Sequence, residues 1–260
     1  MPDSLSASGR QDRIRGRRIV VEVAIVLTVT LGMSGWQSLL VLIRNLLKTV
    51  PLASQNTQLV ETAAPNPWLD LLFQLSYVVT DISWGCLALY LLWLAGMRMR
   101  DIGLDVRRFG RDSLIGVLLA LCVGIPGLGF YLLARAIGIN TNVQPTTLTD
   151  HWWTIPLLIF AAFGNGFVEE TVVVGYLISR LRDARWAMPV VILVSCVLRG
   201  SYHLYQGFGG FIGNVVLGFV FVVVWRKTGR LWPLIIAHTM IDVASFVGYS
   251  LLAPHIGWLR

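Results

Sequence analysis

Long apolar runs recur along the whole 260-residue chain, and they restrict its possible folds more than any other feature. A helix needs about 20 predominantly apolar residues to cross the roughly 30 Å hydrocarbon core of a bilayer. Only 13% of the residues are charged, whereas soluble domains carry about 25%. The sequence therefore predicts an all-α fold, a polytopic transmembrane helical bundle. We expect about seven spans, at residues 19–46, 68–97, 113–136, 153–180, 187–206, 208–226 and 231–252.

The basic residues are distributed as the positive-inside rule requires of a membrane protein. Sixteen of the 21 Lys and Arg residues precede the first apolar run or lie in every second connection after it. This distribution places the N-terminus in the cytoplasm and the C-terminus outside. Since the net charge of +7 is explained by orientation, we expect contact with membrane lipid and no nucleic-acid partner. We expect an integral membrane protein of the bacterial plasma membrane.

Ionisable side chains inside the apolar runs are the candidates for function, because burying them in a membrane is costly. The informative set consists of Glu169 and Glu170 on the fourth span, His203 on the fifth, and His238 and Asp242 on the seventh. His238 and Asp242 are four residues apart and therefore share a helix face. Adjacent helical residues point about 100° apart, so we do not expect Glu169 and Glu170 to face the same point directly.

Two kinds of chemistry fit this set. A buried glutamate beside histidines can act as a general base for water and can return the proton to a leaving amine. Glu169, His203 and His238 are also a possible ligand set for one Zn²⁺, with the fourth position left to water. The residues leave both the metal-free and the zinc mechanism open.

Two further charged residues lie deep in predicted spans, Asp81 and Arg199. Opposite charges buried in a membrane commonly pair with one another. The sequence leaves open whether Asp81 forms a structural ion pair with Arg199 or has a functional role. Asn165, four residues before Glu169, is open to either a site role or a packing role.

At these residues the chain resembles the CPBP intramembrane proteases, also called the CAAX protease or Abi family, which includes the prenyl-protein endoprotease of eukaryotes. That family shows a Glu-Glu-x-x-x-Arg motif, then Phe-x-x-x-His, then His-x-x-x-Asn or Asp. The corresponding segments here are EETVVV (Glu169–Val174), RGSYH (Arg199–His203) and HTMID (His238–Asp242). The resemblance covers about residues 160–247.

The resemblance implies that one glutamate and His203 activate water, while His238 and Asp242 stabilise the oxyanion. The chain departs from the family pattern at two positions: Val174 stands in place of the motif arginine, and Arg199 in place of the motif phenylalanine. Arg199 is four residues before His203, on roughly the same helix face. We therefore predict that Arg199 supplies the missing positive charge to the glutamates from a neighbouring helix.

The sequence is divided accordingly into four parts. We expect residues 1–18 to form a disordered basic cytoplasmic tail and residues 19–152 an N-terminal three-span region. Residues 153–252 are expected to form a CPBP-like catalytic core, and residues 253–260 a short C-terminal tail. The resemblance implies an intramembrane endopeptidase that hydrolyses a membrane-associated or lipid-modified peptide or protein. Two alternatives stay open: a catalytically weakened relative that acts as a binding or immunity protein, and a proton-coupled transporter that uses intramembrane acids as a relay.

Overall fold

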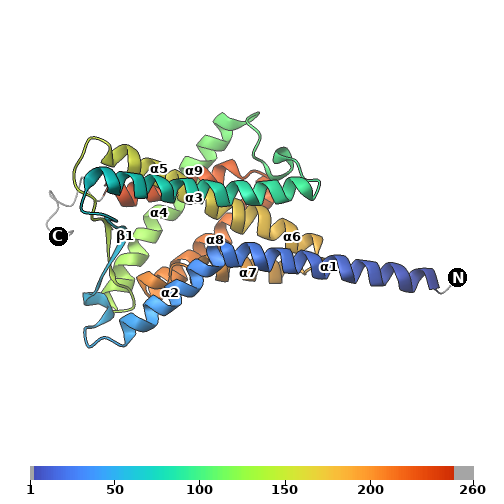
Figure 1. Ribbon diagram of the computed structural model, residues 1–260, viewed down its shortest axis with the longest axis horizontal. Helices are drawn as coiled ribbons and strands as arrows, with labels where there is room; N and C mark the ends of the chain where they lie inside the picture. The colour runs from blue at the N-terminus through green and yellow to red at the C-terminus, as the bar shows by residue number, and fades with distance from the viewer. Residues whose placement is uncertain (1–2, 249–260) are drawn as a thin grey trace.

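The computed structural model describes residues 3–248, and their side chains from residue 11 onward. The described chain is mostly helical (Figure 1). Its helices are α1 (Asp3–Val29), α2 (Leu31–Leu46), α3 (Pro67–Leu94), α4 (Phe109–Ala136), α5 (Thr154–Glu169), α6 (Leu177–Asp183), α7 (Met188–Ser201), α8 (Phe208–Thr228) and α9 (Trp232–Val243). Short 3₁₀ turns lie at Leu52–Ser54, Met99–Ile102 and Leu204–Gln206, and π-helical segments at Glu170–Tyr176 and Ala244–Gly248. The predicted tail 253–260 lies outside the described residues.

Several helices are long and apolar enough to cross a membrane. Four stretches qualify among the described residues, namely α3, α4, Thr154–Asp183 and α8, and the bent pair α1–α2 makes a fifth if it counts as one span. The prediction of a helical membrane protein with several spans is therefore confirmed. The apolar helices Met188–Ser201 and Trp232–Gly248 are shorter than a full span, so the count of seven and the orientation of the N-terminus stay predictions.

The N-terminal part differs from its prediction in two ways. Residues from Asp3 onward are helical and continue into the first apolar run as α1, so the disorder predicted for residues 1–18 is wrong over this stretch. The predicted span 19–46 is bent by 53° between α1 and α2. At the bend the Thr30 hydroxyl donates to the Val26 carbonyl oxygen at 2.7 Å, a contact that often bends helices.

The connections 47–67 and 137–151 form a small sheet that the all-α prediction missed. Strand β1 (Asn56–Val60) pairs in parallel with β2 (Asn142–Thr146), with Asn56 opposite Asn142. On β2 the Val143 amide donates to the Tyr131 hydroxyl of α4 at 2.9 Å. The sheet covers one end of the helices (Figure 1).

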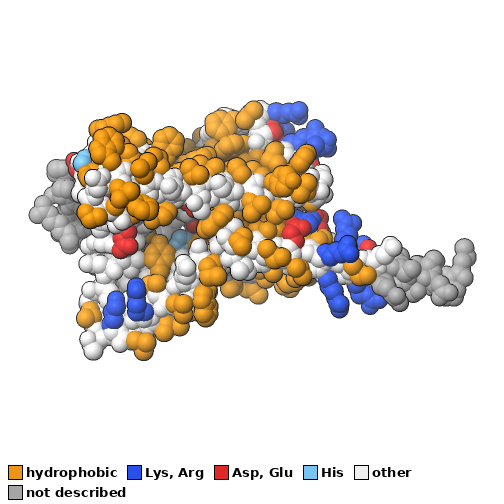
Figure 2. All heavy atoms as spheres, viewed as in Figure 1, with side chains coloured by type: hydrophobic (Ala, Val, Ile, Leu, Met, Phe, Trp, Pro, Cys, Tyr) orange, Lys and Arg blue, Asp and Glu red, His pale blue; other side chains and the backbone are white. Residues whose placement is uncertain are grey.

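The most buried span is the continuous stretch Thr154–Asp183, made of α5, the first π-helical segment and α6. In its most apolar 18 residues 67% are buried, whereas the corresponding fraction in the other long spans is 17–33%. The outer helices present apolar side chains to the surroundings (Figure 2), as expected of helices in contact with lipid. The predicted site residues Glu169 and Glu170 lie on this most buried stretch.

At the end opposite the sheet, Arg230 joins three segments of the chain. Its guanidinium donates to the Asp112 carboxylate at 2.6 and 2.9 Å and also contacts the Asp105 carboxylate. The hydrogen bond from Arg230 lowers the pKa of Asp105 below its usual value. Asp112, in the first turn of α4, is only 1% exposed. Arg230 therefore compensates a buried negative charge.

We expect Arg230→Met to destabilise the protein by roughly 3–5 kcal/mol, because it leaves the buried Asp112 carboxylate without its partner. Thermal unfolding in detergent micelles would measure the loss as a lower midpoint. The matched control is Arg100→Met, which removes only an exposed ion pair with Asp101 at 3.7 Å. Equal midpoints for the two variants would contradict the structural role of Arg230.

Candidate active site

Glu169 and Glu170 lie where the central helix changes its geometry. Glu169 is the last residue of α5, and Glu170 begins the π-helical segment. Both side chains are buried, at 2% and 0% exposure. A π-helical turn is wider than an α-helical one and is common at functional sites. Contrary to the expectation from regular helix geometry, both carboxylates reach the same two neighbours, Arg199 and His238.

Arg199, in α7, is the counter-cation of both glutamates. One guanidinium nitrogen donates to Glu170 Oε1 at 2.7 Å, and the other lies 3.5 Å from Glu169 Oε2. The approach predicted for Arg199 is therefore present. The sequence left open a pair between Arg199 and Asp81; in the structure the guanidinium contacts the two glutamates instead.

The helix α8 makes room for the buried guanidinium. A Cβ atom at Gly218 would lie 3.0 Å from the Arg199 side chain. The guanidinium carbon lies 5.5 Å from the centre of the Phe221 ring, within the range of a cation–π contact. Arg199 is 0% exposed, so α7, α8 and the central helix enclose it completely.

His238, on α9, lies between three carboxylates. Its Nδ1 is 2.7 Å from Glu170 Oε1, and its Nε2 is 3.9 Å from Glu169 Oε2 and 3.7 Å from Asp242 Oδ2. An ionised carboxylate only accepts hydrogen bonds, so Nδ1 is the nitrogen that donates to Glu170. This contact fixes the ring and turns Nε2 towards Glu169 and Asp242.

His203 approaches Glu169 from the turn that follows α7. Its Nε2 is 3.8 Å from Glu169 Oε1, which is too long for a direct hydrogen bond. Nε2 is buried and has no hydrogen-bond partner among the described residues. The chain leaves the helix after Ser201 and passes through the 3₁₀ turn Leu204–Gln206. The break allows the ring to reach Glu169, although the sequence predicts a continuous span over 187–206.

Tyr202 is a site residue that the sequence did not reveal. Its hydroxyl donates to Glu169 Oε2 at 2.6 Å, and its backbone oxygen accepts from Ser38 of α2 at 2.9 Å. A buried tyrosine hydroxyl usually has a hydrogen-bond partner. The position of Tyr202 directly before His203, inside an apolar run, could therefore have indicated a hydrogen bond to a nearby polar group of the site.

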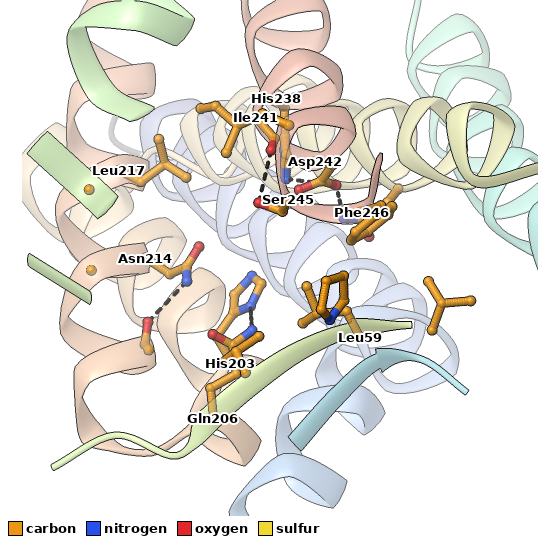
Figure 3. Close-up of a pocket in the computed structure, with 18 of the residues that line it drawn as sticks. Leu59, His203, Gln206, Asn214, Leu217, His238, Ile241, Asp242, Ser245 and Phe246 are labelled. Atoms are coloured by element: carbon orange, nitrogen blue, oxygen red, sulfur yellow. Dashed lines mark hydrogen bonds and ion pairs between the residues drawn. The ribbon is translucent and has the colours of Figure 1, made fainter. Parts of the chain in front are cut away.

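Asp242 and Asn165 form the remaining polar contact of the site. The Asn165 amide nitrogen donates to Asp242 Oδ2 at 2.7 Å. Both residues line a cavity of about 1280 Å³ whose wall also includes Asp81, Glu169 and His203. His203 lies across this cavity from His238 and Asp242 (Figure 3). The structure thus brings together all of the site residues predicted from the sequence.

The predicted zinc ligands lie near one another: His203 Nε2 is 3.8 Å from Glu169 Oε1, and His238 Nε2 is 3.9 Å from Glu169 Oε2. In a tetrahedral site nitrogen and oxygen ligands lie about 2.0–2.2 Å from Zn²⁺. Among the residues that the structure describes, no group of three or more His, Cys, Asp or Glu side chains could hold a metal ion. Zinc at Glu169, His203 and His238 stays a prediction from the sequence, and the mechanism proposed below is written without a metal.

A comparison with known protein families finds a match over the segment that carries these residues. Residues 151–244 match the family model described as type II CAAX prenyl endopeptidase Rce1-like. The matched segment contains Glu169, Glu170, His203, His238 and Asp242. The resemblance to the CPBP or CAAX protease family is therefore confirmed for this part of the chain. No curated protein and no solved structure matches the chain.

We expect Arg199→Met to lower the free energy of unfolding by roughly 3–5 kcal/mol, since two buried carboxylates lose their counter-charge. Adding Glu170→Gln should restore part of the loss, with a coupling of about 0.5–3 kcal/mol. Thermal midpoints of the two single variants and the double variant in detergent measure this cycle.

The control is Arg107→Met, because Arg107 lies exposed in the connection between α3 and α4. If Arg199→Met has the thermal midpoint of the wild type, Arg199 does not compensate the buried carboxylates. The same conclusion follows if the stability losses of Arg199→Met and Glu170→Gln add up to the loss of the double variant.

Proposed function

We propose that the chain is a glutamate-dependent intramembrane endopeptidase of the CAAX-protease type. The observation that carries the proposal is the buried cluster of Glu169, Glu170 and Arg199. With valine at the position of the motif arginine, Arg199 provides the positive charge from α7, at 2.7 Å from one glutamate and 3.5 Å from the other. The Rce1-like match over residues 151–244 supports protease activity at the level of the family.

In this proposal Glu169 is the general base. A water molecule in contact with Glu169 Oε1 and His203 Nε2, which are 3.8 Å apart, can donate its proton to the carboxylate. Its oxygen then attacks the carbonyl carbon of the scissile peptide bond. Tyr202 holds the other Glu169 oxygen at 2.6 Å and so fixes the direction of Oε1.

The tetrahedral intermediate needs hydrogen-bond donors for its oxyanion and a proton for the departing amine. The proton accepted by Glu169 serves the amine, and its transfer can pass through His203 on the same side of the carboxylate. Glu170 holds His238 Nδ1 at 2.7 Å, and in this proposal the His238 ring is protonated on both nitrogens, so that Nε2 also donates to the reacting region. Glu170 thus acts by positioning His238 and Arg199, and Glu169 acts on water.

The cavity supports a membrane-associated or lipid-modified peptide as the substrate. Its volume of about 1280 Å³ exceeds the roughly 300–1,000 Å³ of common small-molecule sites. Its wall combines the polar site residues with apolar side chains of α4 and strand β1, such as Leu128 and Leu59. Such a wall can bind an extended peptide together with an apolar chain. The bacterial plasma membrane stays a prediction from the sequence.

We expect the purified protein in liposomes to cleave a fluorogenic peptide that carries a prenylated C-terminal cysteine motif. Glu169→Gln removes the general base and should lower kcat by about 10²–10⁴-fold. The control is Asp101→Asn, which alters an exposed carboxylate near Arg98 and Arg100 and should change the rate less than twofold.

Cleavage that is equally fast with Glu169→Gln would show that another protease or another residue is responsible. A wild type that binds the peptide without cleaving it would instead favour the weakened relative that acts as a binding protein. A transmembrane reporter peptide without a lipid, tested beside the prenylated one, shows which of the two substrate classes is preferred.

We further expect cleavage to persist in the presence of 1,10-phenanthroline, because the site residues activate water without a metal in this proposal. Metal analysis of the purified active protein should find less than about one zinc per ten chains, since structural or catalytic zinc binds stoichiometrically. Loss of activity on chelation, followed by recovery on adding Zn²⁺, would refute the metal-free mechanism.

A further inference from the structure

The segment before the glutamates brings Asn165 to the edge of the site. Asn165 lies one helical turn before Glu169, so both side chains project from one face of α5. The next residue, Gly166, allows α5 to approach α9 closely: a Cβ atom there would lie 2.9 Å from the Thr239 hydroxyl and 3.1 Å from its backbone nitrogen. This close packing sets Asn165 against Asp242.

The contact between these two residues has a defined direction. Asp242, when ionised, can only accept hydrogen bonds, so the amide nitrogen of Asn165 and not its oxygen faces it, at 2.7 Å. An asparagine amide has two N–H donors, and Asp242 takes one of them. Because Asn165 lines the cavity, its second N–H is available there to a substrate.

Asp242 Oδ2 marks a point where donors converge. Asn165 Nδ2 lies 2.7 Å from this oxygen, and His238 Nε2 lies 3.7 Å from it. A negatively charged oxygen next to two nitrogen atoms resembles the arrangement that stabilises the oxyanion of a tetrahedral intermediate. Asp242 itself cannot stabilise an oxyanion as a carboxylate, because it offers no donor and carries the same charge.

We propose that Asn165 is a catalytic residue that donates a hydrogen bond to the oxyanion, and that Asp242 is a positioning residue that orients its amide. This inference rests on the proposed protease function. When water attacks the peptide carbonyl, the carbonyl π electrons move to oxygen, and the Asn165 N–H and His238 stabilise the charge. When the C–N bond breaks, the C=O bond re-forms, the amine leaves with a proton, and the amide of Asn165 is unchanged.

The test compares steady-state kinetics of five proteins on the prenylated fluorogenic peptide: the wild type, Asn165→Ala, Asn165→Asp, Asp242→Asn, and the exchange variant Asn165→Asp with Asp242→Asn. Asn165→Ala should lower kcat by about 10²–10³-fold, as removal of one oxyanion donor does, with KM changed less than threefold. Asn165→Asp should be at least as slow, because two carboxylates then face each other.

The exchange variant decides between the catalytic and the purely structural role. It restores an amide–carboxylate pair with the amide on α9, so it should regain kcat to within about tenfold of the wild type, as expected when a donor is again present. Asp242→Asn alone keeps the Asn165 donor and should retain more activity than Asn165→Ala. Thermal midpoints of all variants show whether each is folded.

A transition-state mimic gives a second measurement. A peptide phosphonate should bind Asn165→Ala more weakly by about the factor lost in kcat, while binding of the uncleaved peptide is unchanged. The matched control is Asn56→Ala, which removes an exposed amide contact with Asn142 in the sheet at 2.9 Å and should change neither value.

The inference is overturned if Asn165→Ala keeps the wild-type kcat. It is also overturned if the exchange variant melts like the wild type and yet stays as inactive as Asn165→Asp. Failure of the wild type to cleave either reporter is a different result, because it removes the proposed function itself.

Discussion

The buried contact of Arg199 with Glu169 and Glu170 is the interaction on which the rest of the site depends. Two carboxylates in a membrane interior are costly unless a positive charge and hydrogen bonds compensate them. Arg199 provides that charge at 0% exposure, while Tyr202 and His238 supply the hydrogen bonds. Gly218 and Phe221 of α8 form the space that the guanidinium fills. The charge thus enters from α7, while position 174, where the motif has its arginine, is a valine.

The site is built at places where regular helices end. Glu170 begins a π-helical segment, and His203 lies in the turn after α7. Helix α9 passes into a second π-helical segment directly after the turn that holds Asp242. Straight helices would direct neighbouring side chains apart, whereas these irregular segments direct them to one cavity. Such irregular backbone is tolerated at membrane depth only where it is enclosed by protein or lines a cavity.

The N-terminal helices support this core from one side. Glu22 of α1 accepts from Arg180 at 2.7 Å and from the Tyr176 hydroxyl at 3.0 Å, next to the π-helical segment. Ser38 of α2 holds the backbone of Tyr202. These contacts connect the bent pair α1–α2 to both walls that carry catalytic candidates, so the region outside the family match also helps to fix the site.

The sequence predicted the participants of the site better than their geometry. The motif spacing identified Glu169, His203 and His238, and the helix spacing of Arg199 predicted its approach to the glutamates. The shared contacts of Glu169 and Glu170 could not be predicted, because the sequence pattern does not show a π-helical turn. The bend at Thr30 and the parallel pairing of β1 with β2 were missed for a related reason: hydropathy reports burial in a membrane and contains no information on breaks or on pairing between distant loops. Whether Arg199 pairs with Asp81 or with the glutamates could not be decided from the sequence, because the depth of a residue in the membrane does not show which way its side chain points.

The central claim is that Glu169 activates a water molecule for attack on a peptide bond in spite of the valine at position 174. The most direct test is cleavage of the reporter peptide in ¹⁸O-labelled water, followed by mass spectrometry of the fragments. The account predicts one ¹⁸O atom in the new C-terminal carboxylate of the wild-type product, and formation of that labelled product about 10²–10⁴-fold more slowly by Glu169→Gln. Cleavage without ¹⁸O in that carboxylate, or labelled product formed equally fast by both proteins, would contradict it.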